Sequence, residues 1–137
     1  MRDAKRSEDF YHDVLGLEVR NYTRVGKMVF LTRNPEIDHE IALAELGPNA
    51  VGPFPDQVGL YHMAWDLANM DELKDAYQVV LDNKVDIAGF GDHGETKGLY
   101  IRDPDGIEIE LFTNAPEFEE TSLKENLTGG SRQGAIA

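Results

Sequence analysis

Two stretches of the chain repeat one another at an offset of 66 residues. The matching pairs are Tyr11 and Tyr77, Val14 and Val80, and Leu15 and Leu81. Apolar residues at positions i, i+3 and i+4 in each stretch predict a short amphipathic helix. Gly16 and Asn83 fit the left-handed residue that ends a helix. The chain is therefore expected to contain two copies of one module, a helix followed by strands, and two copies favour a pair over a solenoid.

Runs of apolar and β-branched residues predict the strands of both modules. These runs cover residues 28–33, 39–46, 59–67, 99–102 and 107–113. The glycines and prolines of residues 47–57 indicate a linker. We therefore expect an α+β fold with a first module at residues 1–52, a second at residues 53–116, and a polar C-terminal tail at residues 117–137, whose residues 129–134 are expected to be loose.

The alternation of side chains along two of these strands places ionisable residues on one face. His62 and Ala64 share a face of the 59–67 strand, while Met63 and Trp65 share the other. On the 107–113 strand, Glu110 points away from the apolar side chains that would pack on a helix. A curved sheet that wraps this face around a pocket would bring His62 and Glu110 together.

Composition excludes several classes of function. The 137 residues carry a net charge of −13, which disfavours nucleic acid as a partner because binding to phosphates needs a basic surface. No apolar run approaches the ~20 residues that span a bilayer, so no membrane partner is expected. The chain has no cysteine, so a transition metal would need His, Asp or Glu ligands. Because no signal peptide opens the chain, we expect a cytoplasmic location.

One stretch sets a histidine, a phenol and a carboxylate at fixed spacing around a turn. It runs from Gly91-Asp92-His93 through Leu99-Tyr100 and Asp103-Pro104-Asp105-Gly106 to Glu110. This spacing resembles the signature of the extradiol ring-cleavage dioxygenases, a branch of the vicinal-oxygen-chelate (glyoxalase/bleomycin resistance) superfamily. The proline and glycine predict a tight turn at residues 103–106, to which we assign no chemistry.

The resemblance implies a fold and a set of roles. The implied fold is two βαβββ modules with a curved mixed sheet around a metal and substrate pocket. His62 and Glu110 match metal ligands, two of the three in the two-His-one-carboxylate set that binds Fe(II), with Mn, Zn or Ni as alternatives. His93 matches a residue beside the oxygen and substrate site, and Tyr100 matches one that hydrogen-bonds a substrate hydroxylate. His39, which follows Asp38 in the stretch Asp-His-Glu-Ile-Ala-Leu, matches a family acid/base.

Each of these residues also has a structural interpretation. His62 could be a hydrogen-bonded histidine of the sheet, Glu110 an exposed strand residue, and Tyr100 an amphipathic core residue. His93 could be an exposed loop histidine, and His39 could lie at a strand end. His12, off the apolar stripe of the first helix, is expected on the surface.

The chain departs from the family pattern at its start. Family members open with a strand reading roughly His-Val-x-Leu-x-Val-Arg-Asp, and this chain matches from Arg2-Asp3 onward. We therefore expect the first strand of the first module to be absent, and with it the histidine that is the third metal ligand. Loss of a ligand should weaken metal binding by more than the ~10–100-fold that outer-shell changes cost.

Three functions remain in competition. The resemblance favours an extradiol dioxygenase that opens a catechol-type aromatic ring with Fe(II) and O₂. A glyoxalase-like, metal-dependent isomerase or lyase is the second, and a metal-free protein that binds a small aromatic or an antibiotic is the third. Superfamily precedent favours a homodimer in each case.

Overall fold

The computed structural model describes residues 1–128 and divides the chain into two compact units. The first unit contains residues 1–59 together with residues 103–107, and the second contains residues 60–102 together with the chain from Glu108 onward. The linker expected at residues 47–57 thus belongs to the first unit, as does the Asp-Pro-Asp-Gly turn. No helix within residues 1–128 is long and apolar enough to cross a membrane.

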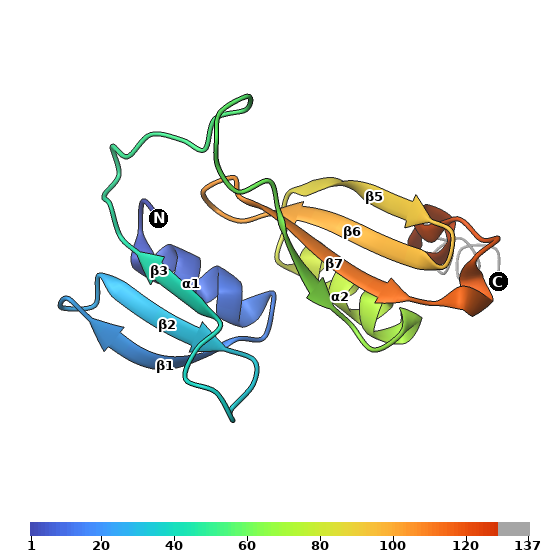
Figure 1. The fold of residues 1–137 in the computed structure, drawn as a ribbon, viewed down its shortest axis with the longest axis horizontal. Coiled ribbons are helices and arrows are strands. Elements are labelled where there is room, and N and C mark those ends of the chain that lie inside the picture. Colours follow the sequence, from blue (N-terminus) through green and yellow to red (C-terminus); the bar gives the residue numbers. More distant parts are fainter. Residues whose placement is uncertain (129–137) are drawn as a thin grey trace. The chain divides into compact units, whose positions relative to one another are not determined.

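The first unit places a helix on one face of a three-stranded antiparallel sheet (Figure 1). Helix α1 (Ala4–Asp13) precedes β1 (Glu18–Thr23), β2 (Met28–Thr32) and β3 (Ile41–Ala44), and the strand order is β1-β2-β3. Gly16 has φ +70° and Leu17 donates its N–H to the Tyr11 carbonyl, so α1 ends as the sequence predicts.

The second unit carries a four-stranded sheet with the order β4-β7-β6-β5. Strand β4 (Met63–Asp66) leads into α2 (Met70–Asp82), which is followed by β5 (Ile87–His93), β6 (Thr96–Arg102) and β7 (Glu108–Asn114). β4 runs parallel to β7 and the other pairs are antiparallel. The α+β prediction is confirmed.

The end of α2 differs by one residue from the sequence prediction. Asn83 has an ordinary φ of −89°, and Lys84 takes the left-handed conformation with φ 55°. The Asn83 side-chain amide donates a hydrogen bond of 2.9 Å to the Val79 carbonyl. The Val79 carbonyl also accepts the Asn83 backbone N–H, and the left-handed residue that ends α2 is Lys84 rather than Asn83.

The two units differ in what precedes their helices. In the second unit β4 lies beside β7 and enters α2, whereas the described part of the first unit enters α1 directly from Met1. The Met1 ammonium donates to the Ala44 carbonyl at 2.6 Å, and the Leu46 N–H donates to the Met1 carbonyl at 2.7 Å. These two bonds form one rung of a parallel ladder, so Met1 lies beside the chain that continues β3.

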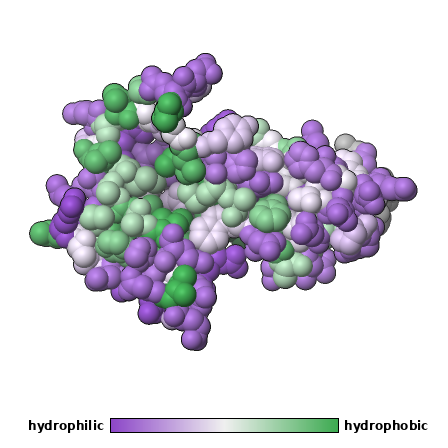
Figure 2. Space-filling model, in the orientation of Figure 1, coloured by the Kyte–Doolittle hydropathy of each residue, from purple (hydrophilic) through white to green (hydrophobic). Residues whose placement is uncertain are grey.

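The hydrophobic side chains of the first sheet are not all covered. Val29, Leu31 and Leu43 are buried on the α1 side, while Met28 and Phe30 lie on the opposite face and are only partly buried. Figure 2 shows hydrophobic residues gathered over this sheet and along the segment that follows β3. Exposed apolar residues of that segment are Leu46, Val51, Phe54 and Val58.

Part of the expected polar tail is packed against the second unit. Residues 116–118 form the 3-10 turn η1 (Pro116–Phe118), and residues 123–128 are helical. Leu123 is fully buried, and its N–H donates to Asp92, which also pairs with the buried Lys97. Residues 117–128 are thus part of the folded unit, and the rest of the tail, with the expected loose residues 129–134, lies outside the described residues.

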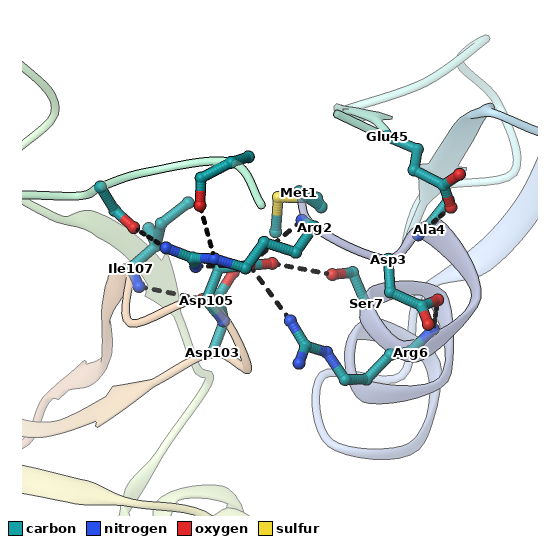
Figure 3. Close-up of polar contacts among 12 residues, drawn as sticks. Met1, Arg2, Asp3, Ala4, Arg6, Ser7, Glu45, Asp103, Asp105 and Ile107 are labelled. Carbon is teal, nitrogen blue, oxygen red and sulfur yellow. Dashed lines mark hydrogen bonds and ion pairs between the residues drawn. The ribbon is translucent and has the colours of Figure 1, made fainter. Parts of the chain in front are cut away.

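Two carboxylates of the Asp-Pro-Asp-Gly turn hold it to α1 and to the start of the chain (Figure 3). Asp103 is buried, accepts the Tyr11 hydroxyl at 2.9 Å, and accepts the N–H groups of Asp105 and Ile107. Asp105 accepts Arg2 at 2.9 Å and Arg6 at 3.1 Å. The turn therefore does more than reverse the chain, because it anchors the helix of the first unit.

Asp105 should make the stability of the protein sensitive to acid. Burial raises the pKa of Asp105, but hydrogen bonds from the Arg2 backbone and guanidinium, with the charge of Arg6, outweigh it and leave the pKa below its ordinary value. A carboxyl with a lowered folded-state pKa stabilises the fold above the unfolded-state pKa of about 3.9, and this contribution is lost as pH falls through the folded-state value.

We therefore expect Asp105→Asn to cost about 1–3 kcal/mol of unfolding free energy at pH 7, because two arginines lose their anionic partner. The difference between the variant and the unsubstituted protein should shrink as pH falls below about 3.9 and should vanish below the folded-state pKa of Asp105. Urea unfolding between pH 2.5 and 7 measures this, and a cost that stays constant across that range would contradict the assignment.

Candidate functional site

The face of the second sheet that α2 leaves open collects the residues expected from side-chain alternation. Ala64 of β4 lies opposite Glu110 of β7, and Glu110 lies opposite Tyr100 of β6. His62 comes two residues before Ala64, so it shares that face. Ile109 and Leu111 are buried on the other face. Strand alternation thus explains why ionisable and aromatic groups line one surface while the apolar groups build the core.

His62 and Glu110 meet on this face. The distance between His62 Nε2 and Glu110 Oε2 is 3.2 Å, and their side chains are 24% and 12% exposed. The other ring nitrogen of His62, Nδ1, is buried and has no hydrogen-bond partner among the described residues. A half-buried imidazole that faces a carboxylate and lacks a second partner is unusual for a residue with a purely structural role, because buried polar atoms are normally hydrogen-bonded.

Tyr100 completes a cluster of three groups. Its ring lies edge-on to the His62 ring, with centroids 5.6 Å apart. Burial raises the pKa of the Tyr100 hydroxyl, and a hydrogen bond to Glu110 and the negative charge of that carboxylate raise it further. At neutral pH Tyr100 is therefore a phenol that can donate a hydrogen bond.

A hollow of about 240 Å³ opens beside this cluster. Its walls combine aromatic rings with a few polar groups: Tyr61, His62, Ala88, Gly89, Phe90, Tyr100, Arg102 and Glu108. Ligand pockets usually measure ~300–1,000 Å³, so this hollow suits a small molecule such as a single aromatic ring.

The His62–Glu110 pair fits two positions around a metal ion. Two donor atoms that each bind one ion at about 2.1 Å, and at nearly a right angle, lie about 3 Å apart. The observed 3.2 Å agrees with that separation. Within residues 1–128 no group of three or more His, Cys, Asp or Glu side chains could hold an ion together. Among residues 1–128, His62 and Glu110 are thus a pair with the donor types and spacing of two positions in a facial triad.

The other two predicted histidines are not brought to this pair. His93 ends β5 opposite Thr96 and is exposed. Thr96 lies four residues before Tyr100 on β6, which is about 13 Å along a strand. His39 belongs to the first unit, where it precedes β3, pairs with Asp38 at 2.5 Å and contacts the Phe30 ring. The roles expected for His39 and His93 therefore stay predictions.

Sequence reasoning missed three features of the site. Tyr61 lines the hollow and stacks at a tilt on His62, with ring centroids 5.0 Å apart. Gly91 and Gly98 lie beneath Tyr100 and Glu110. The sequence signal for these contacts was the presence of the two glycines on the same face of adjacent strands. It could be used only once the strand at residues 87–93 was known.

Comparison with known proteins identifies the family of the chain. The model of the glyoxalase/bleomycin resistance protein/dioxygenase superfamily matches residues 1–111. The chain belongs to this superfamily. The matched range contains His62, Tyr100 and Glu110, the three residues clustered on the open face.

Two ring-cleaving relatives are similar over most of this chain. The catechol-2,3-dioxygenase of Bacillus subtilis (strain 168) is 33% identical over 117 residues, which cover 85% of this chain and 39% of that protein. The biphenyl-2,3-diol 1,2-dioxygenase 3 of Rhodococcus globerulus is 37% identical over 105 residues, which cover 74% of this chain and 53% of that protein. The superfamily member described here thus spans about half, or less, of the length of these relatives.

Solved structures show the same fold. A glyoxalase/dioxygenase from Nostoc punctiforme superposes with a TM-score of 0.68 at 25% identity, covering 83% of this chain and 85% of that one. A glyoxylase/bleomycin resistance protein/dioxygenase domain from Frankia sp. EAN1pec gives a TM-score of 0.70 at 17% identity, covering 89% and 92%. The superfamily fold is therefore common to proteins with different named activities.

Proposed function

We propose that this protein acts as an extradiol-type dioxygenase on a small aromatic diol, with Fe(II) and O₂. The observation that carries the proposal is the 3.2 Å approach of His62 and Glu110 on a sheet face that also bears Tyr100. The named activities of the two ring-cleaving relatives support the same chemistry. The reaction would break a ring C–C bond next to the two hydroxyls and place both oxygen atoms of O₂ in the product.

His62 and Glu110 would hold the metal through an imidazole nitrogen and a carboxylate oxygen. Fe(II) bound there would supply Lewis acidity toward the diol and a site for O₂. Two protein ligands leave the other positions of the ion to water, substrate or further protein groups. Mn(II) is the closest substitute for this donor set, since oxygen and imidazole ligands suit both ions.

Tyr100 and the aromatic walls would bind and orient the diol. The Tyr100 phenol donates a hydrogen bond, which would stabilise a substrate oxygen that has lost its proton. The rings of Tyr61 and Phe90 border the hollow and would pack on the substrate ring while keeping water away from it. An imidazole is the expected acceptor for the proton that the diol loses, and His39 and His93 are the candidates.

Oxygen consumption tests the proposal directly. The protein is loaded with Fe(II) under anaerobic conditions and then mixed with air-saturated buffer and a panel of catechols and biphenyl diols. We expect one O₂ consumed for each diol opened, with no uptake by the metal-free protein. Absence of uptake with both Fe(II) and Mn(II) would contradict the proposal.

The same panel separates the competing functions. Diol binding that is equally tight with and without metal would favour a metal-free binding protein. A preference for Zn or Ni with no oxygen uptake would favour a glyoxalase-like isomerase or lyase. The homodimer and the cytoplasmic location expected from the sequence stay predictions.

Removal of the Tyr100 hydroxyl should affect the reaction without affecting the metal. We expect Tyr100→Phe to lower kcat/KM for a catechol by about 10²-fold, the range typical for loss of a positioned proton donor. Fe(II) affinity should stay within about two-fold of the unsubstituted protein, because changes of that size correspond to less than ~0.5 kcal/mol. Tyr61→Phe is the matched control, and an equal loss in both variants would show that Tyr100 has no special role.

A further inference from the structure

Two glycines face one another across β5 and β6 on the open face of the second sheet. Gly91 pairs with Gly98 in the strand register, on the face that carries Tyr100 and Glu110. Neither glycine has a positive φ, so the backbone conformation does not require glycine at either position. Glycine weakens the interior of a strand, and its presence there often marks a close approach by another group.

The group that approaches Gly98 is the Glu110 side chain. A Cβ atom on Gly98 would lie 3.2 Å from Glu110 Cδ and 3.3 Å from Cγ, and it would overlap Oε1. The other carboxylate oxygen, Oε2, is 3.2 Å from His62 Nε2. The carboxylate therefore lies flat on β6, with one oxygen above Gly98 and the other toward His62.

The group that approaches Gly91 is the Tyr100 ring. A Cβ atom on Gly91 would lie 2.7 Å from Tyr100 Cε2 and 3.1 Å from the hydroxyl oxygen. The ring thus leans from β6 over β5, and its hydroxyl interacts with Glu110. The two polar groups meet above the glycine pair.

We propose that the Gly91–Gly98 pair is a floor that positions the Glu110 carboxylate and the Tyr100 hydroxyl, with Gly98 serving the carboxylate and Gly91 the phenol. Both are positioning residues, since they act through the side chains above them. The part of this inference that concerns metal affinity rests on the proposed function. The part that concerns where the side chains lie stands on the contacts alone.

A third glycine provides a matched control. Gly89 also lies on this face of β5, directly opposite Tyr100. A Cβ atom on Gly89 would meet nothing within 4 Å. Gly89→Ala therefore adds the same methyl group to the same strand without a clash, and any general effect of removing a glycine appears in both variants.

The test compares Gly98→Ala, Gly91→Ala and Gly89→Ala in the full chain. Fe(II) affinity is measured by anaerobic calorimetry, thermal unfolding by circular dichroism, and the position of the carboxylate by crystallography. The clash at Gly98 falls on the end of a flexible side chain, so Glu110 should swing away at little cost. We expect Gly98→Ala to bind Fe(II) about 10–100-fold more weakly, with a Tm within about 4 °C of the unsubstituted protein.

The other two variants give different results if the floor acts as proposed. Gly91→Ala should keep Fe(II) affinity within about three-fold and should raise the KM for a catechol, because the Tyr100 ring must move. Gly89→Ala should keep the Fe(II) affinity and the Glu110 position of the unsubstituted protein, and because Gly89 borders the hollow it is not used as a control for the KM. In crystals, the Glu110 Oε2 to His62 Nε2 distance should increase only in Gly98→Ala.

Each contrary result has a distinct meaning. Gly98→Ala that retains Fe(II) affinity, with its carboxylate still beside His62, overturns the inference. If the unsubstituted protein binds no Fe(II), the proposed function fails, and the crystallographic distances alone decide whether the floor exists. Should Gly98→Ala unfold, the Gly98→Ala/Glu110→Ala double variant decides: recovery of the fold supports the contact, and failure in both backgrounds overturns it.

Discussion

Glu110→Ala should abolish Fe(II)-dependent oxygen uptake. The substitution removes one of the two proposed metal donors, and the other, His62, would then bind alone. We expect Fe(II) affinity to fall by more than the ~10–100-fold that follows loss of an outer-shell partner. Anaerobic calorimetry with Fe(II), followed by oxygen-electrode measurements with a catechol, checks both parts.

Glu108 supplies the matched control for this prediction. It is the preceding carboxylate on the same face of β7, it borders the hollow, and it lies opposite Arg102 rather than Tyr100. Glu108→Ala removes the same charge from the same strand, so Fe(II) affinity should stay within about three-fold of the unsubstituted protein. Equal losses in the two variants would mean that the effect is one of general charge and that Glu110 is not a ligand.

Lys97→Ala should destabilise the second unit and release its C-terminal segment. The Lys97 side chain is fully buried, and its ammonium pairs with Asp92 at 2.5 Å and donates to the Thr121 carbonyl at 2.7 Å. Asp92 in turn accepts the N–H of Leu123. The Asp92 side chain is 37% exposed, so solvent weakens the ion pair, and loss of the hydrogen bonds of the buried lysine should cost about 1–3 kcal/mol of unfolding free energy. The substitution should also release the segment at residues 116–128.

Urea unfolding measures the global loss, and limited proteolysis reports release of the C-terminal segment. Lys27→Ala, at an exposed position in the first unit, should change the unfolding free energy by less than about 0.5 kcal/mol. The two effects of Lys97→Ala should appear together. Wild-type resistance to proteolysis in a destabilised Lys97→Ala variant would show that the segment is held by Leu123 and Leu127 alone.

Side-chain alternation in the sequence was enough to predict that His62 and Glu110 meet on one face of the sheet. His62, which immediately precedes β4, and Glu110 of β7 are 48 positions apart in sequence, yet side-chain parity places both on the face away from α2. The pairing of β4 with β7 sets Ala64 opposite Glu110, and the side chain of His62, two residues earlier, approaches Glu110 to 3.2 Å. The alternation of buried and exposed side chains constrains strand register strongly, because a shift of one residue would turn the apolar side chains of the strand to the open face.

The sequence was much less informative about β5 and the residues that pack beside it. Gly89, Gly91 and Asp92 disfavour a strand when judged by local propensity, and only pairing with β6 makes them one. Lys97 was equally hidden, because lysine is almost never fully buried and its partner Thr121 is 24 residues away. The first failure concerns pairing across a hairpin, which the propensities of single residues do not record, and the second concerns a contact between segments distant in sequence.

The backbone hydrogen bonds of Met1 beside the chain that continues β3 affect where a tag can be attached to the protein. Its ammonium donates to Ala44 and its carbonyl accepts from Leu46, so whatever is fused ahead of it enters alongside an unpaired strand rather than into open solvent. An affinity tag or fluorescent label at that end would compete for the exposed backbone groups and could link molecules edge to edge.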